Sequence, residues 1–225
     1  MITNNRQRIV DLTHPIHEGM TTFPVAWHPY VEVSLLARHG IEERETRKLV
    51  LGTHSGTHMD APRHFVRNGA TVDHVPLTTL VGPTQVVDWT DLDELTQIEP
   101  DDLEQRINKD SCERLLMRYD WCRWWGDKKF YESHPFISEE SAHWMNEHGV
   151  KLVGMDAPQL DNPMHGRGSG NDSPIHKILL GADVVFVECL RNLKQIRQPT
   201  CTLVVLPLNV IDGDGAPARC IAIEE

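Results

Sequence analysis

The stretch Gly52-Thr53-His54-Ser55-Gly56-Thr57-His58-Met59-Asp60-Ala61-Pro62-Arg63-His64-Phe65 places three histidines and a carboxylate within eleven residues. Imidazole and carboxylate groups are preferred ligands of borderline and hard divalent metal ions. Because metal–ligand bonds are about 2.0–2.2 Å long, the ligating atoms must converge on one point. The stretch therefore predicts a metal site, on condition that the backbone brings these side chains together.

Neither regular secondary structure satisfies that condition. In an extended strand His54 and Asp60 would lie roughly 20 Å apart, at about 3.3 Å per residue. On a helix His54 and His58 would converge, but Asp60 would point away and Pro62 would disturb the following turn. A tight loop satisfies all three ligands, since Gly56 gives the backbone its freedom and Pro62 stiffens the exit. We therefore expect a functional loop here.

Two other interpretations of this cluster stay open from spacing alone: a histidine-rich surface loop, and a set of carboxylate–imidazole hydrogen bonds without a metal. Ser55 stands where the H-E-x-x-H pattern of zinc peptidases has glutamate, which excludes that class. Nine other histidines are expected to be ordinary surface or core residues. They are His14, His17, His28, His39, His74, His134, His143, His148 and His165.

The rest of the chain predicts a single α/β domain over residues 1–225 with a mixed β-sheet core and flanking helices. Neither an internal repeat nor a linker divides it. The segment 161–174, rich in Gly, Asn, Ser and Pro, is expected to be a mobile loop and a lid. Strands are expected at 9–12, 30–36, 46–52, 81–89, 114–117, 150–155, 184–187, 203–206 and 220–223, and helices at 101–107 and 138–149.

Composition limits the partners. The net charge of −11 opposes binding to nucleic acid, whose phosphates attract basic proteins. No apolar run reaches the roughly 18 residues of a membrane span, and the first residues lack a signal-peptide pattern, so we expect a cytoplasmic protein without a membrane partner. The five scattered cysteines form no C-x-x-C pair and are expected to be small core residues.

The segment from His54 to His64 matches the signature H-x-G-T-H-x-D-x-P-x-H at every fixed position. It thereby resembles the Putative cyclase family of metal-dependent hydrolases, which includes bacterial kynurenine formamidase, isatin hydrolase and a trans-dienelactone hydrolase. The segments 10–16, 206–208 and 215–219 resemble the opening and the close of the family. The resemblance implies a swivelling β/β/α-like fold.

The same resemblance implies a set of metal ligands. The first metal would be held by His54, His58 and Asp60. Asp60 would bridge to a second metal, completed by His176 and Glu188, whose spacing of 188 − 176 = 12 is that of the family. Because isatin hydrolases resemble this pattern and use one manganese, the cofactor is expected to be zinc or manganese, one or two ions per chain.

Two segments depart from the formamidase pattern. Ile175-His176 replaces a pair of histidines, and Tyr119-Asp120-Trp121 stands where a Thr-Gly-Trp run is more familiar. The identity of the substrate therefore stays open.

A metal with open positions lowers the pKa of a bound water and polarises a carbonyl, which predicts hydrolysis of a small cyclic amide, aryl formamide or lactone. The resemblance makes His64 the general acid/base, a role worth about 10²–10⁴-fold. Phe23 and Trp27 are candidates for the wall of a flat substrate pocket, with core packing as the alternative.

Other functions and assemblies stay open. The alternatives are a metal-stabilised binding protein without turnover, and a lyase or cyclase acting on an enolisable ketide. The cluster Trp121, Trp124 and Trp125 suits a pocket or a subunit interface equally. By resemblance, and because two-fold assemblies are the commonest, we expect a homodimer.

Overall fold

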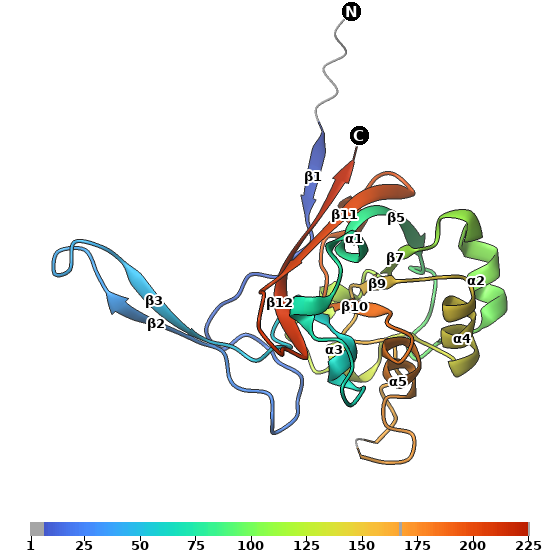
Figure 1. Cartoon of the computed structure of the whole chain (residues 1–225), viewed down its shortest axis with the longest axis horizontal. Coiled ribbons are helices and arrows are strands. Elements are labelled where there is room, and N and C mark those ends of the chain that lie inside the picture. Colours follow the sequence, from blue (N-terminus) through green and yellow to red (C-terminus); the bar gives the residue numbers. More distant parts are fainter. Residues whose placement is uncertain (1–6, 167, 225) are drawn as a thin grey trace, which may run out of the picture.

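The computed structural model describes residues 7–166 and 168–224, so residues 1–6 of the expected signal-free start and Arg167 of the expected lid lie outside it. Seven strands form a closed barrel in the order β12-β11-β5-β7-β9-β10-β4, with β4 pairing back to β12, and β1 adds an eighth strand along β12 (Figure 1). Their bounds are Arg8–Asp11 (β1), His58–Asp60 (β4), Val81–Asp88 (β5), Arg114–Arg118 (β7), Leu152–Met155 (β9), Val185–Glu188 (β10), Thr200–Pro207 (β11) and Gly215–Glu224 (β12).

The barrel is parallel in one half and antiparallel in the other. The pairs β5–β7, β7–β9 and β9–β10 are parallel. Helices follow these strands because a parallel neighbour can be reached only through a crossover. The α-helices are Leu77–Leu80 (α1), Pro100–Arg106 (α2), Lys129–Glu132 (α3), Glu139–Glu147 (α4) and Pro174–Leu180 (α5). In Figure 1, α2, α4 and α5 lie on one side of the barrel.

Five short 3₁₀ helices and two small sheets complete the described elements. The 3₁₀ helices are Pro62–His64 (η1), Val72–His74 (η2), Lys109–Ser111 (η3), Trp121–Trp124 (η4) and Leu193–Gln195 (η5). The small sheets pair Glu32–Ala37 (β2) with Thr46–Val50 (β3), and Gln97–Ile98 (β6) with Phe136–Ile137 (β8). In Figure 1 the β2–β3 hairpin projects away from the barrel. No helix in the two described ranges is long and apolar enough to cross a membrane.

Alternating side chains divide the core into two layers. On β7, Leu115 and Met117 pack with residues of α2, α4 and α5 in the outer layer, whereas Leu116 belongs to a second cluster drawn from the barrel strands. Strand geometry explains the division, because successive side chains point to opposite faces. On β4 the buried Met59 belongs to the inner cluster. His58 and Asp60 therefore face outward, toward the helices.

The expected mixed-sheet α/β class with flanking helices is confirmed, and most expected strands and both expected helices lie within a few residues of their positions. Two details differ. The motif expected to be loop throughout contains the short strand β4, because its pairing with β10 and β12 is long-range. Helix α5, which contains the apolar run 178–180, was not expected from the sequence. Four of the five cysteines are buried, as expected of core residues, and Cys122 is half-buried.

Candidate metal centre and pocket

A tight turn carries His54 back toward β4. Gly56 adopts a φ of +68°, in the left-handed region that favours glycine, and a Cβ there would lie 2.9 Å from the Met20 side chain. Thr57 fixes the end of the turn, because its Oγ1 donates to the Cys189 carbonyl at 2.6 Å and accepts from the His14 amide at 2.9 Å. The expected fold-back of the chain is thus observed.

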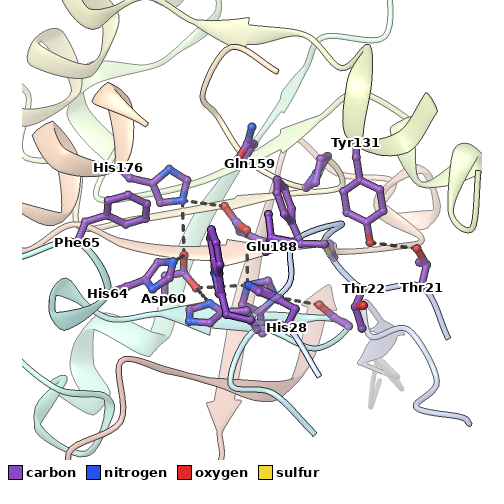
Figure 2. A pocket seen from close by; sticks show the side chains of 18 of the residues that line it. Thr21, Thr22, His28, Asp60, His64, Phe65, Tyr131, Gln159, His176 and Glu188 are labelled. Carbon is purple, nitrogen blue, oxygen red and sulfur yellow. Dashed lines mark hydrogen bonds and ion pairs between the residues drawn. The ribbon is translucent and has the colours of Figure 1, made fainter. Parts of the chain in front are cut away.

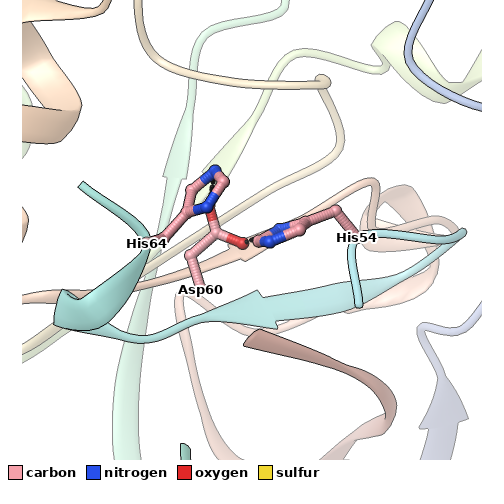
Figure 3. Close-up of side chains that lie close together, drawn as sticks. All are labelled: His54, Asp60 and His64. Atoms are coloured by element: carbon pink, nitrogen blue, oxygen red, sulfur yellow. Dashed lines mark hydrogen bonds and ion pairs between the residues drawn. The ribbon is translucent and has the colours of Figure 1, made fainter. Parts of the chain in front are cut away.

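Beyond β4, Pro62 begins the 3₁₀ turn η1, which points His64 back toward Asp60. The His64 amide donates to the Ala61 carbonyl at 2.9 Å. His54, Asp60 and His64 therefore lie together, as Figure 3 shows.

Asp60 is the centre of the cluster, and its two carboxylate oxygens face different histidines. Oδ1 lies 2.6 Å from His54 Nδ1 and 3.3 Å from His58 Nε2. Oδ2 lies 3.6 Å from His176 Nε2 and 4.0 Å from His64 Nε2. Asp60 is 1% exposed, so these four rings and not water surround its charge.

Glu188, on β10, faces two of the histidines that surround Asp60, His58 and His176. Its Oε2 lies 3.5 Å from His58 Nε2, and its Oε1 lies 3.4 Å from His176 Nε2 (Figure 2). Oε1 is buried and has no hydrogen-bond partner among the described residues. A buried carboxylate oxygen in this state is costly unless a cation is bound near it.

Three of the imidazole rings are oriented by hydrogen-bond partners that are not themselves predicted ligands. His58 Nδ1 donates to the Gly56 carbonyl at 2.8 Å, and His176 Nδ1 donates to the Asp161 carboxylate. His54 uses its other nitrogen, Nε2, to donate to Asp214 Oδ2 at 2.8 Å. Metal-binding histidines in proteins usually have such a partner.

Carboxylates raise the pKa of two of these rings, those of His54 and His176. Burial by itself lowers the pKa of His54, but Asp60 and Asp214 outweigh it and raise that pKa to about 10. Burial also lowers the pKa of His176, but the Asp161 carboxylate outweighs this effect, so that pKa lies well above its usual value. A divalent metal would replace these protons, so we expect metal binding to weaken as the pH falls.

A pocket of about 210 Å³ opens beside this cluster. Half of the residues that line it carry an aromatic or imidazole ring, and among the described lining residues there is no lysine or arginine. The aromatic and histidine residues beyond the metal cluster are Phe23, Trp27, His28, Phe65, Trp125 and Tyr131. The loop before β2 forms one wall and is tied to α3 through Thr21 Oγ1, which donates to the Tyr131 hydroxyl at 3.3 Å (Figure 2).

All the sequence-predicted site residues gather here. His54, His58, Asp60, His64, His176 and Glu188 line the pocket, together with Phe23 and Trp27. The alternative role of core packing is wrong for Trp27, which is 72% exposed. Of the tryptophan cluster, Trp125 lines the pocket.

Sequence reasoning missed three residues. His28 was expected to be ordinary, yet it lines the pocket, and burial together with repulsion from the nearby histidines lowers its pKa to about 4. Its position beside Trp27 was a signal. Asp214 precedes the segment 215–219 that carries the family resemblance, which was also a signal. For Asp161, placed in the expected lid, there was none.

The donors present fit a divalent metal. His58, Asp60 and Glu188 are all buried, and one ligand atom of each lies within 4.8 Å of the others. His54, Asp60 and His64 form a second group at the same spacing, in which His54 and His64 are half-buried. Two sets of nitrogen and oxygen donors that share one carboxylate match the ligand chemistry of zinc and manganese.

Comparison with known proteins identifies one family and full-length relatives. Residues 10–162 match the family model described as "Putative cyclase". The chain is 30% identical over 215 residues to a kynurenine formamidase of Salinibacter ruber, covering 95% of this chain and 96% of the relative.

Solved structures give the same fold. Isatin hydrolase A from Labrenzia aggregata, bound to benzyl benzoate, superposes with a TM-score of 0.84 at 25% identity, covering 96% of this chain and 93% of the other. A protein described as "predicted metal-dependent hydrolase from Bacillus stearothermophilus" superposes with a TM-score of 0.77 at 27% identity, covering 97% and 99%.

Proposed function

We propose that this chain, which belongs to the family described as "Putative cyclase", is a metal-dependent hydrolase of the amide bond in a small aromatic substrate. One observation carries the proposal. Two groups of imidazole and carboxylate donors, one wholly buried and one partly buried, share Asp60 and open onto a pocket with aromatic side chains in its walls. A metal that served only stability would have a closed site, without a ligand position that faces a pocket.

In this proposal His54, His58 and Asp60 would hold one metal, and Asp60 would be shared with a second one held by His176 and Glu188. The two directions in which Asp60 and Glu188 present their oxygens support the bridging role. Bound there, zinc or manganese supplies Lewis-acid chemistry: it lowers the pKa of water and polarises a carbonyl.

In the proposed reaction His64 takes a proton from the attacking water and passes it to the leaving nitrogen. Its Nδ1 is held by Asp214 Oδ2 at 3.2 Å, so its Nε2 faces the cluster and is free to accept a proton. After the amide bond breaks, the same nitrogen returns the proton to the leaving group. The ring is 25% exposed, so it has room to serve both the cluster and the pocket.

The walls favour a flat substrate with an aromatic ring. Phe23 and Tyr131 form an edge-to-face pair with centroids 5.4 Å apart on one side, and Phe65 packs against His176 on the other. The isatin hydrolase relative was solved with benzyl benzoate, whose two aromatic rings fit the same preference. Two of the relatives are named for kynurenine and for isatin, which both contain an aromatic ring, in agreement with this class.

The test is hydrolysis of a panel containing N-formylkynurenine, isatin, a dienelactone and simple aryl esters, each with zinc and with manganese. We expect turnover of an aromatic amide that stops on chelation and returns when the metal is restored. Full turnover by a metal-free preparation contradicts the proposal. Tight binding of panel compounds without any turnover would support a binding protein instead.

We also propose a homodimer. The β2–β3 hairpin exposes Leu35, Leu36, Ile41 and Leu49, and a lone two-stranded hairpin is marginally stable in water. A second copy packed on it would bury these side chains. Light scattering at micromolar concentration is expected to give twice the chain mass of 25.6 kDa, and a particle of one chain mass contradicts this proposal.

A further inference from the structure

One carboxylate oxygen contacts two rings of the cluster. Asp214 Oδ2 lies 2.8 Å from His54 Nε2 and 3.2 Å from His64 Nδ1. The two rings lie against each other, with centroids 3.9 Å apart and an angle of 32° between their planes. A single side chain therefore fixes the orientation of both.

The barrel closure places Asp214 at this point. Gly215, the next residue, is the register partner of Asp60 in the pairing of β12 with β4. The Asp214 carbonyl accepts a hydrogen bond from the Ala61 amide at 2.9 Å, so the backbone on both sides of the carboxylate is held. The side chain is 37% exposed and reaches the rings from the rim of the cluster.

Each ring then directs its remaining nitrogen toward the cluster. His54 presents Nδ1 to Asp60 Oδ1 at 2.6 Å, and His64 presents Nε2 at 4.0 Å from Asp60 Oδ2. Because the carboxylate accepts a hydrogen bond from one nitrogen of each ring, it fixes which nitrogen faces the cluster, Nδ1 of His54 and Nε2 of His64.

The backbone of Gly215 confirms that this ring position is tightly defined. A Cβ at Gly215 would lie 2.8 Å from His54 Cε1 and 2.7 Å from the Met59 carbonyl oxygen. Only glycine leaves room for the imidazole there. His54 is thus bounded by backbone on one side and fixed by Asp214 at the far nitrogen.

The other orienting partners serve one ring each: the Gly56 carbonyl serves His58, and Asp161 serves His176. We propose that Asp214 is a positioning residue with two effects, orienting His54 for metal binding and His64 for proton transfer. The inference rests on the proposed function of the cluster. It predicts that one substitution changes two properties that can be measured separately.

The experiment compares Asp214→Asn, His64→Asn and the double variant as full chains loaded with zinc. Asp214→Asn keeps the size of the side chain, and the position is partly exposed, so the full chain should stay folded, as circular dichroism reports. Zinc retention, measured by competition with a chelator, should weaken by about 10–100-fold, the usual effect of losing such a partner. His64→Asn alone should retain zinc.

Turnover tests the second effect. Asp214→Asn should lower kcat by no more than His64→Asn does, with a smaller change in KM, because it acts through that ring. In the His64→Asn background, removing Asp214 should lower kcat by less than about twofold further while still weakening zinc retention. The inference is overturned if the loss in kcat of the double variant equals the product of the two single losses. It is also overturned if Asp214→Asn retains zinc as well as the parent does.

Asp212→Asn is the matched control. Asp212 is exposed in the same turn, and its φ of +59° suits asparagine, so both zinc retention and kcat should stay unchanged. The zinc measurement needs no substrate. If every panel compound is inert but the parent binds zinc, the proposed function fails. The comparison of zinc retention still tests whether Asp214 orients His54.

Discussion

Glu188 lies directly opposite His58 in the antiparallel pairing of β10 with β4, and its Oε2 is 3.5 Å from His58 Nε2. In the same register Phe186 lies opposite Asp60. Two strands from distant parts of the chain thus bring one carboxylate and one imidazole to the same face. This pairing fixes the distance between the donor atoms of Glu188 and His58 before any metal binds.

His64→Asn should separate proton transfer from metal binding. Asparagine keeps much of the size and one hydrogen-bonding nitrogen but removes the titratable ring. We expect kcat to fall by about 10²–10⁴-fold with metal content unchanged. Steady-state kinetics and metal analysis on the same preparation measure both.

The control for that variant is His58→Asn, which should lose metal and activity together, because His58 lies within the buried donor group. If His64→Asn also releases metal, His64 is a ligand, a role that its 4.0 Å approach to Asp60 Oδ2 permits.

His176→Ala and Glu188→Ala should each lower the metal stoichiometry or weaken its retention. Both residues are buried, and the His176 ring lies near both Asp60 and Glu188, so removing either residue leaves the proposed second metal site incomplete. Metal content is measured after dialysis against a weak chelator. Unchanged content in both variants would indicate a single-metal site, with Glu188 orienting a ligand.

Trp27→Ala should raise KM for an aromatic substrate by about tenfold, corresponding to about 1.4 kcal/mol of lost contact. Its side chain is 72% exposed at the pocket, so the thermal midpoint should change little. Leu77→Ala, at a similarly exposed position on α1 that does not line the pocket, is the control and should leave KM unchanged.

Asp156 should make the stability of the protein fall as the pH rises. Burial, with the nearby charge of Asp120, raises the pKa of this carboxyl to about 7, although the Tyr119 amide donates to its Oδ1 at 2.9 Å. Since the folded pKa exceeds the unfolded value of about 3.9, the contribution to stability is full below that value and is lost as the pH rises through about 7.

Asp156→Asn removes this titration, because the amide stays neutral and its oxygen still accepts the Tyr119 amide. Relative to the parent, its thermal midpoint should rise by at least roughly 2–4 °C between pH 5 and pH 8, a change of about 1 kcal/mol. The exposed Asp93→Asn is the control and should show no such trend. Parallel pH profiles of the parent and Asp156→Asn would contradict the prediction.

Local sequence was enough for the elements whose signals lie within a few residues. Ser138 accepts the Ser141 amide at 3.1 Å as the N-cap of α4, where the sequence placed a helix start. The alternation of strands and helices predicted an α/β domain with a mixed sheet, but not the closure of that sheet into a barrel. The spacing from His54 to His64, with Gly56 inside it, required the turn that the structure has.

Only the tertiary structure decided the rest. Closure of the barrel depends on the pairing of β4 with β12, and it alone places Asp214 against His54 and His64. Asp161 reaches His176 from the segment expected to be a lid. The sequence by itself determined which ligands are available and how the motif must turn. Register between strands far apart in the chain leaves no local pattern, because it is fixed by the summed packing and pairing of the whole barrel, so the partners that orient those ligands emerged only from the fold.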